Sequence, residues 1–141
     1  MVRKAKAIVL DAWAIMAYLE DEPAGEKVAN AIADAHEDDT PLFMSIINVG
    51  EVWYIIAREA SVAQADHSIT QLRQLGIEFV EADWSLTHDA AIYKSKHKMS
   101  FADCFAAALA KQKKAVLLTG DSDFKTVERE IAIDWLRLPR R

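Results

Sequence analysis

Four acidic residues stand at the ends of, or inside, the most apolar segments of this chain. They are Asp11, Glu51, Asp103 and Asp121. Two of them follow short apolar runs, and the other two lie in long helical stretches whose neighbours are almost all apolar. A buried ionised carboxylate must be paired or must coordinate a metal. We therefore expect the fold to place these acids beside positively charged side chains or around a metal cation.

Short apolar runs alternate with longer helical patterns along the whole chain. Strands are expected at residues 5–11, 42–44, 77–80, 116–118 and 131–135. Helices are expected at residues 12–19, 24–35, 45–58 with Ser45 or Asn48 as cap, 62–75 with Gly76 as stop signal, from about 83 to 94, and 101–111. This alternation predicts an α/β fold with a central, mostly parallel sheet of about five short strands flanked by helices. We expect residues 1–141 to form one domain.

Composition narrows the classes of function. With 141 residues, 52% hydrophobic and 28% charged, the chain can bury a sizeable core and is not disordered. The single Cys104 can form no internal disulfide, so a cytoplasmic protein is expected. No segment reaches the roughly 20 apolar residues of a membrane span. A net charge of −5 argues against broad, sequence-blind binding of nucleic acid.

The acids predict a site for a hard divalent cation. Groups at the carboxyl ends of adjacent parallel strands converge on one crevice. Oxygen ligands without a Cys or His cluster suit Mg²⁺ or Mn²⁺ rather than zinc or copper. Such a cation, single or one of a pair, polarises a phosphorus centre and supplies hydroxide, so the pattern indicates phosphoryl-transfer chemistry.

Taken in order, four fragments resemble the PIN domain, and in particular the VapC toxins of toxin–antitoxin pairs. The fragments are residues 9–11, 45–52, 100–110 and 118–124. The resemblance implies that the metal-binding and catalytic acids are Asp11, Glu51, Asp103 and Asp121, and that Thr119 and Asn48 support them. Asp123 is a second candidate for the fourth acid. Trp13 is a departure, because many PIN domains carry Ser or Thr at this position.

The same resemblance implies a function and partners. It implies a metal-dependent endoribonuclease that acts on structured RNA such as tRNA, forms a homodimer and is inhibited by a cognate antitoxin. We expect the antitoxin to dock a helix on apolar residues of the early helices and to reach the acids with a basic side chain. These apolar residues are Ile15, Met16, Leu19, Trp53, Tyr54 and Ile55.

Other interpretations remain open from the sequence. Asp103 follows Ser100 at capping-box spacing, and Asp121 could be an ordinary N-cap. A housekeeping RNA-processing nuclease and a non-catalytic binding module would both keep the fold. A signalling receiver would need a lysine at the end of a late strand, where this chain has Thr119-Gly120-Asp121. Two lysine groups are the best phosphate-contacting candidates, namely Lys94, Lys96 and Lys98, and Lys111, Lys113 and Lys114.

Overall fold

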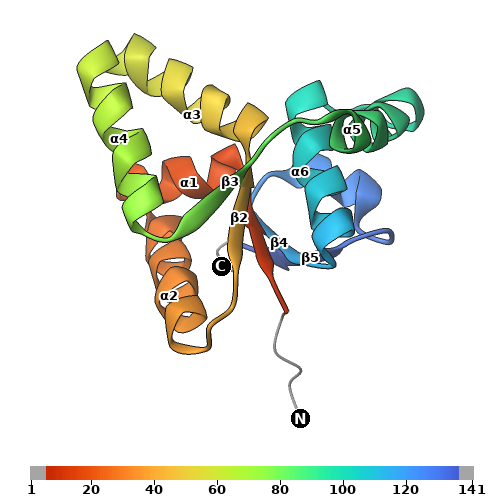
Figure 1. The fold of residues 1–141 in the computed structure, drawn as a ribbon, viewed down its shortest axis with the longest axis horizontal. Coiled ribbons are helices and arrows are strands. Elements are labelled where there is room, and N and C mark those ends of the chain that lie inside the picture. The colour runs from red at the N-terminus through yellow and green to blue at the C-terminus, as the bar shows by residue number, and fades with distance from the viewer. Residues whose placement is uncertain (1–5, 137–141) are drawn as a thin grey trace, which may run out of the picture.

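The centre of the fold is a five-stranded sheet, seen in the computed structural model, which describes residues 6–136 (Figure 1). The strands are β1 (Ile8–Leu10), β2 (Leu42–Ser45), β3 (Ile77–Val80), β4 (Val116–Thr119) and β5 (Ala132–Trp135). Their order across the sheet is β3-β2-β1-β4-β5, and every pairing among the described residues is parallel. The predicted α/β fold with a parallel sheet of five short strands is therefore confirmed.

Helices cover both faces of this sheet. They are α1 (Ala12–Leu19), α2 (Pro23–Glu37), α3 (Ile46–Glu59), α4 (Val62–Gln74), α5 (Trp84–Lys96) and α6 (Phe101–Lys113), and a 3₁₀ helix, η1 (Ser122–Val127), follows β4. One apolar core packs under α5, α6 and η1, and the other under α1 to α4. Figure 1 shows these two groups on opposite sides of the strands. Among the described residues, no helix has the length and apolar character needed to cross a bilayer.

The boundaries differ from the predicted ones in a few places. β1 begins only at Ile8, and Asp11 is the N-cap of α1 rather than part of the strand. Residue 5, which we expected in this strand, lies outside the described residues. The helix predicted to end at residue 35 continues to Glu37, and η1 was not predicted. Ser45, rather than Asn48, caps α3. Gly76, with φ of 81°, directly follows the C-cap of α4 and so stands where the helix stop was predicted.

The register of β1 and β4 determines where the acids lie. Leu10 pairs with Leu118, so Asp11, just after β1, and Thr119, the last residue of β4, lie side by side at the carboxyl edge of the sheet. Helix α6 contacts both strands, and its first turn carries Asp103. The parallel sheet thus presents polar groups from distant parts of the sequence at a single edge.

Candidate active site

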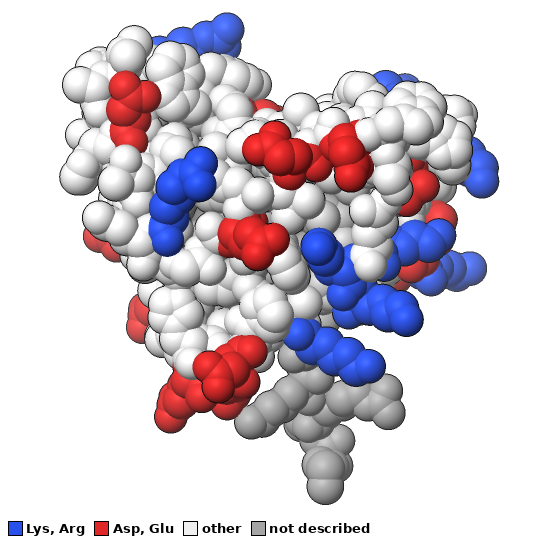
Figure 2. Space-filling view, viewed as in Figure 1, with Lys and Arg blue, Asp and Glu red and all other residues white. Residues whose placement is uncertain are grey.

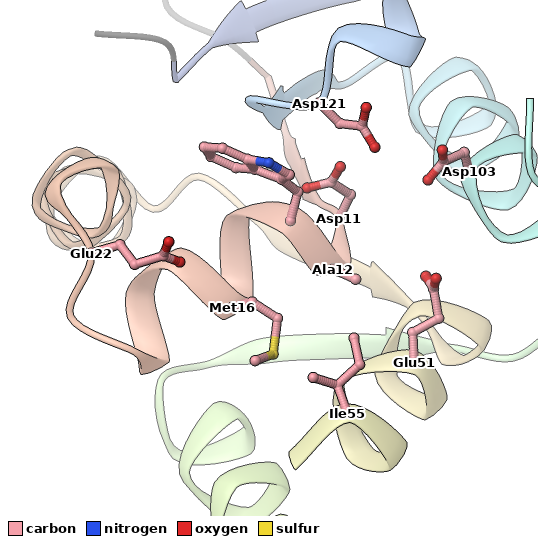
Figure 3. A pocket seen from close by; sticks show the side chains of 9 residues that line it. Asp11, Ala12, Met16, Glu22, Glu51, Ile55, Asp103 and Asp121 are labelled. Carbon is pink, nitrogen blue, oxygen red and sulfur yellow. The ribbon is translucent and has the colours of Figure 1, made fainter. Parts of the chain in front are cut away.

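A pocket of about 290 Å³ opens at this edge of the sheet. Its lining contains the four acids expected from the sequence, Asp11, Glu51, Asp103 and Asp121. They come from the end of β1, from α3, from α6 and from the turn after β4. Figure 3 shows their carboxylates directed into one shared space. The remaining lining residues are Ala12, Trp13, Met16, Glu22 and Ile55.

Asp11 is the buried member of this group, with 2% of its surface exposed. One carboxylate oxygen accepts the backbone N–H of Ala14 at 2.9 Å, which caps α1. The other accepts the hydroxyl of Thr119 at 2.5 Å. The Thr119 oxygen in turn accepts the backbone N–H of Asp121 at 3.1 Å. Thr119 therefore holds the first and the last acid in fixed relation across the β1–β4 pair.

Asp103, Asp121 and Asp123 form a second, more exposed set. Each offers a carboxylate oxygen, and these oxygens all lie within 4.8 Å of one another. Ser100 caps α6 by accepting the N–H of Asp103 at 3.1 Å, and Asp121 accepts the N–H of Asp123 at 2.9 Å. Asp103 and Asp121 thus take part in helix capping and also line the pocket, whereas Asp123 is exposed beside it.

Glu51 is held by Asn48, one turn earlier on α3. The Asn48 amide nitrogen donates to Glu51 Oε1 at 2.8 Å and to the carbonyl of Ala102 at 3.1 Å. Asn48 is fully buried, and its Oδ1 has no hydrogen-bond partner among residues 6–136. Because Ala102 precedes Asp103, this one side chain ties the α3 acid to the first turn of α6.

Burial and repulsion from neighbouring acids shift Asp11, Glu51 and Asp103 toward the neutral form. Burial raises the pKa of Asp11 from 3.8 to about 7, against the opposing effect of the Thr119 and Ala14 hydrogen bonds. Burial, followed by the charges of Asp121 and Glu51, raises the pKa of Asp103 to about 6. The pKa of Glu51 is raised too, chiefly by burial. Ionised carboxylates in such a place require a nearby cation.

The donor set fits a hard divalent cation. All candidate ligand atoms are carboxylate oxygens, which Mg²⁺ and Mn²⁺ prefer, and no His or Cys lines the pocket in the described part of the chain. Mg²⁺ keeps several water ligands and therefore does not require every acid to touch it directly. Asp11, Asp103 and Asp121 surround the shared space most directly, and Glu51 approaches it from α3 (Figure 3).

The other half of the pocket is apolar, and sequence reasoning identified it only in part. Met16 and Ile55 were expected in a docking groove, and both line this pocket. Ile15, expected in the same groove, is fully buried in the core, because α1 is packed against α2, α3 and β4. Glu22, just before α2, was not anticipated, since an acid in a turn carries no sequence signal of its distant neighbours.

Among the described residues, no lysine or arginine lines the acidic pocket. Lys94 donates to the carbonyl of Met99, while Lys111 and Lys113 lie over the rings of Tyr93 and Phe43. Figure 2 shows acidic side chains at and below a notch in the upper outline, and the main group of basic side chains at the lower right.

Comparisons with known proteins identify the family. The family model for the PIN domain matches residues 8–130. The chain belongs to the PIN domain family. A comparison with curated proteins finds no sequence match.

Solved structures with this PIN fold include toxins and toxin–antitoxin complexes. One is Mycobacterium tuberculosis VapC20, a Sarcin-Ricin loop cleaving toxin (17% identity, TM-score 0.68, 86% of this chain and 95% of that chain). Another is VapBC2 from Rickettsia felis bound to a promoter DNA fragment (14%, 0.74, 91% and 97%). A third is VapBC-1 from nontypeable Haemophilus influenzae (16%, 0.70, 92% and 98%). At these identities the likeness shows a shared fold.

Proposed function

We propose that this PIN domain is a Mg²⁺- or Mn²⁺-dependent endoribonuclease and the toxin of a type II toxin–antitoxin pair. The observation that carries the proposal is the convergence of four carboxylates, from four separate elements, on one pocket of a PIN domain. Acids that repel one another and are partly withdrawn from water destabilise the metal-free fold. A bound cation would offset this destabilisation by attracting the carboxylates.

The environment of each acid in the pocket decides the role that we assign to it. A bound cation supplies Lewis acidity toward the phosphate and activates water. Asp11, Asp103 and Asp121 would hold it, with Asp11 kept in place by Thr119. Glu51 has one oxygen engaged by Asn48 and lies on the opposite wall, which suits it to orient the attacking water and accept its proton. No side chain needs to become covalently attached to the substrate.

The proposed partners are a cognate antitoxin, a second copy of the chain and structured RNA such as tRNA, all in the cytoplasm. Leu19 and Trp53 lie on the same two helices as the lining residues Met16 and Ile55 and are partly buried against the core. Tyr54 on α3 is 43% exposed. An antitoxin helix laid over these residues would bring a basic side chain to the acids. Solved VapBC complexes of this fold contain such a partner pair.

The test is metal-dependent cleavage of RNA by the purified chain. Total RNA and tRNA are incubated with Mn²⁺ or Mg²⁺, and the new RNA ends are sequenced. Asp103→Asn should lower the cleavage rate by orders of magnitude, whereas the matched control Asp34→Asn, an exposed acid on α2, should leave it unchanged. Equal rates for Asp103→Asn and the wild type would reject the nuclease assignment.

Co-expression separates the toxin from a processing nuclease. The chain is produced with the product of the neighbouring upstream reading frame, purified, and assayed for RNase activity during a titration with Mn²⁺. An inhibited complex that high Mn²⁺ reactivates supports the toxin. Absence of a complex, or a complex that is fully active at low Mn²⁺, would favour the housekeeping nuclease. A folded chain that neither cleaves RNA nor binds Mn²⁺ would be a binding module.

A further inference from the structure

Trp13 is a large aromatic residue that remains 39% exposed at the mouth of the acidic pocket. It lies in the first turn of α1, two residues after Asp11, and lines the pocket together with Asp121. Exposure alone assigns no role, since Trp84 on α5 is 73% exposed and does not line this pocket. What distinguishes Trp13 is its place beside the acids that would face a phosphate.

The indole of Trp13 packs on Gly120, the residue that follows β4. The outer edge of its six-membered ring occupies the space that a Cβ atom at residue 120 would fill. Gly120 joins Thr119, which bonds Asp11, to Asp121. The ring therefore has a set position relative to both acids. A preset aromatic surface loses little conformational freedom when a planar ligand stacks on it.

The charge of the pocket determines what kind of contact can bind RNA there. Five acids line it, namely Asp11, Glu22, Glu51, Asp103 and Asp121, and no lysine or arginine does in the described residues. A cation can neutralise the phosphate at the point of cleavage, but nothing in this pocket attracts the neighbouring phosphates. Within the described lining of the pocket, further affinity for RNA therefore has to come from uncharged groups. Trp13, Ala12, Met16 and Ile55 form the apolar part of the lining, and an apolar surface suits the face of a base.

We propose that Trp13 is the platform on which a base adjacent to the scissile phosphate stacks. The proposal rests on the nuclease function proposed above. Stacking on an aromatic side chain contributes affinity for single-stranded nucleic acid without any need for positive charge. Trp13 would thus be a substrate-binding residue, while the acids perform the chemistry.

The test compares variants that change the ring in different ways. Trp13→Leu keeps apolar bulk but removes the aromatic face, Trp13→Phe keeps a ring, and Gly120→Ala displaces the ring without removing it. Trp84→Leu is the matched control at an exposed tryptophan away from the pocket. Binding of a short single-stranded oligoadenylate is measured in Ca²⁺, which we expect to support little turnover, beside an abasic oligomer of equal length.

Trp13→Leu should bind oligoadenylate roughly 5- to 150-fold more weakly than the wild type, the range for loss of one stacked base. Gly120→Ala should lose affinity in the same direction, and Trp13→Phe should retain most of it. The wild type should prefer oligoadenylate to the abasic oligomer, and Trp13→Leu should lose that preference. The Mn²⁺ affinity of Trp13→Leu and Trp13→Phe should stay unchanged, which distinguishes stacking from a structural role in the acidic site.

Two results would overturn the proposal. One is equal affinity of Trp13→Leu and the wild type for both oligomers while the wild type cleaves RNA, which would reject stacking and leave the nuclease intact. The other is a loss that is confined to binding of the co-expressed protein partner, which would assign the ring to a protein contact. A wild type that neither binds nor cleaves any RNA with Mn²⁺ would reject both this proposal and the nuclease function.

Discussion

Replacing Asp11 by Asn should lower the stability of the fold at acid pH and raise it at alkaline pH. Its pKa is raised from 3.8 to about 7, chiefly by burial. The folded protein therefore binds this proton more tightly than the unfolded chain does. The resulting stabilisation is fully present below about pH 4 and is lost as the pH rises through about 7. In the absence of metal, the wild type should lose stability from this group over that window.

The magnitude follows from the pKa and the hydrogen bonds. A rise from 3.8 to about 7 corresponds to about 4 kcal/mol of unfolding free energy, at about 1.4 kcal/mol for each pKa unit. Asn can still cap α1 by accepting the N–H of Ala14. The hydroxyl of Thr119, however, loses the oxygen that accepts it, at a cost of about 1–2 kcal/mol. Asp11→Asn should thus be about 1–2 kcal/mol less stable near pH 4 and about 2 kcal/mol more stable near pH 8.

Urea denaturation in EDTA at pH 4, 6 and 8 measures this crossover. Asp34→Asn is the matched control, since Asp34 is an exposed acid on α2, and its difference from the wild type should stay near zero. Saturating Mn²⁺ at pH 8 should favour the wild type again, because a ligand that binds only the folded state adds RT ln(1 + [L]/Kd). A variant that is destabilised equally at all three pH values would refute the reasoning, since Asp11 would then carry no buried charge.

Three further predictions concern the cation, its supporting residues and the helix that presents Asp103. EDTA should abolish RNA cleavage, and Mg²⁺ or Mn²⁺ should restore it while Ca²⁺ restores little; cleavage that survives chelation would contradict the metal site. Asn48→Ala should lower Mn²⁺ affinity, measured by calorimetry, by roughly 10- to 100-fold, because Glu51 and the Ala102 carbonyl lose their shared donor. Ser100→Ala should lower the unfolding free energy by about 1 kcal/mol through loss of the α6 cap, and an unchanged urea midpoint would contradict this.

Much of the fold could be predicted because its signals are local. Buried strands in a parallel sheet appear as short apolar runs, and the helix starts carry capping residues such as Ser61, Asp83 and Ser100. Gly76 and Pro23 marked an end and a start correctly. The order of the strands across the sheet is a different matter. It depends on which apolar surfaces pack together across the whole chain, and no periodicity records that.

The candidate site, too, was predictable in its local features and not in its long-range contacts. The four acids stood out because a carboxylate in an apolar setting is costly, wherever its partners lie. The contacts that organise them connect residues far apart in sequence, as in Thr119 with Asp11 and Asn48 with Ala102. Sequence spacing cannot reveal such pairs. The packing of the Trp13 ring on Gly120 could not be predicted from the sequence either. A lone glycine after a strand normally indicates a turn rather than a ring packed onto it.

The polar partners of the acids indicate what the site lacks. Asp11 accepts hydrogen bonds from the Thr119 hydroxyl and the Ala14 N–H, and Glu51 accepts one from the Asn48 amide. No lysine or arginine of the described residues lines their pocket. Neutral donors orient a carboxylate without cancelling its charge. While the acids are ionised, their repulsion can therefore be relieved by a metal cation or by a basic side chain of a partner. Both would occupy the same space, so we expect a metal cation and the basic side chain of an antitoxin to compete for these acids.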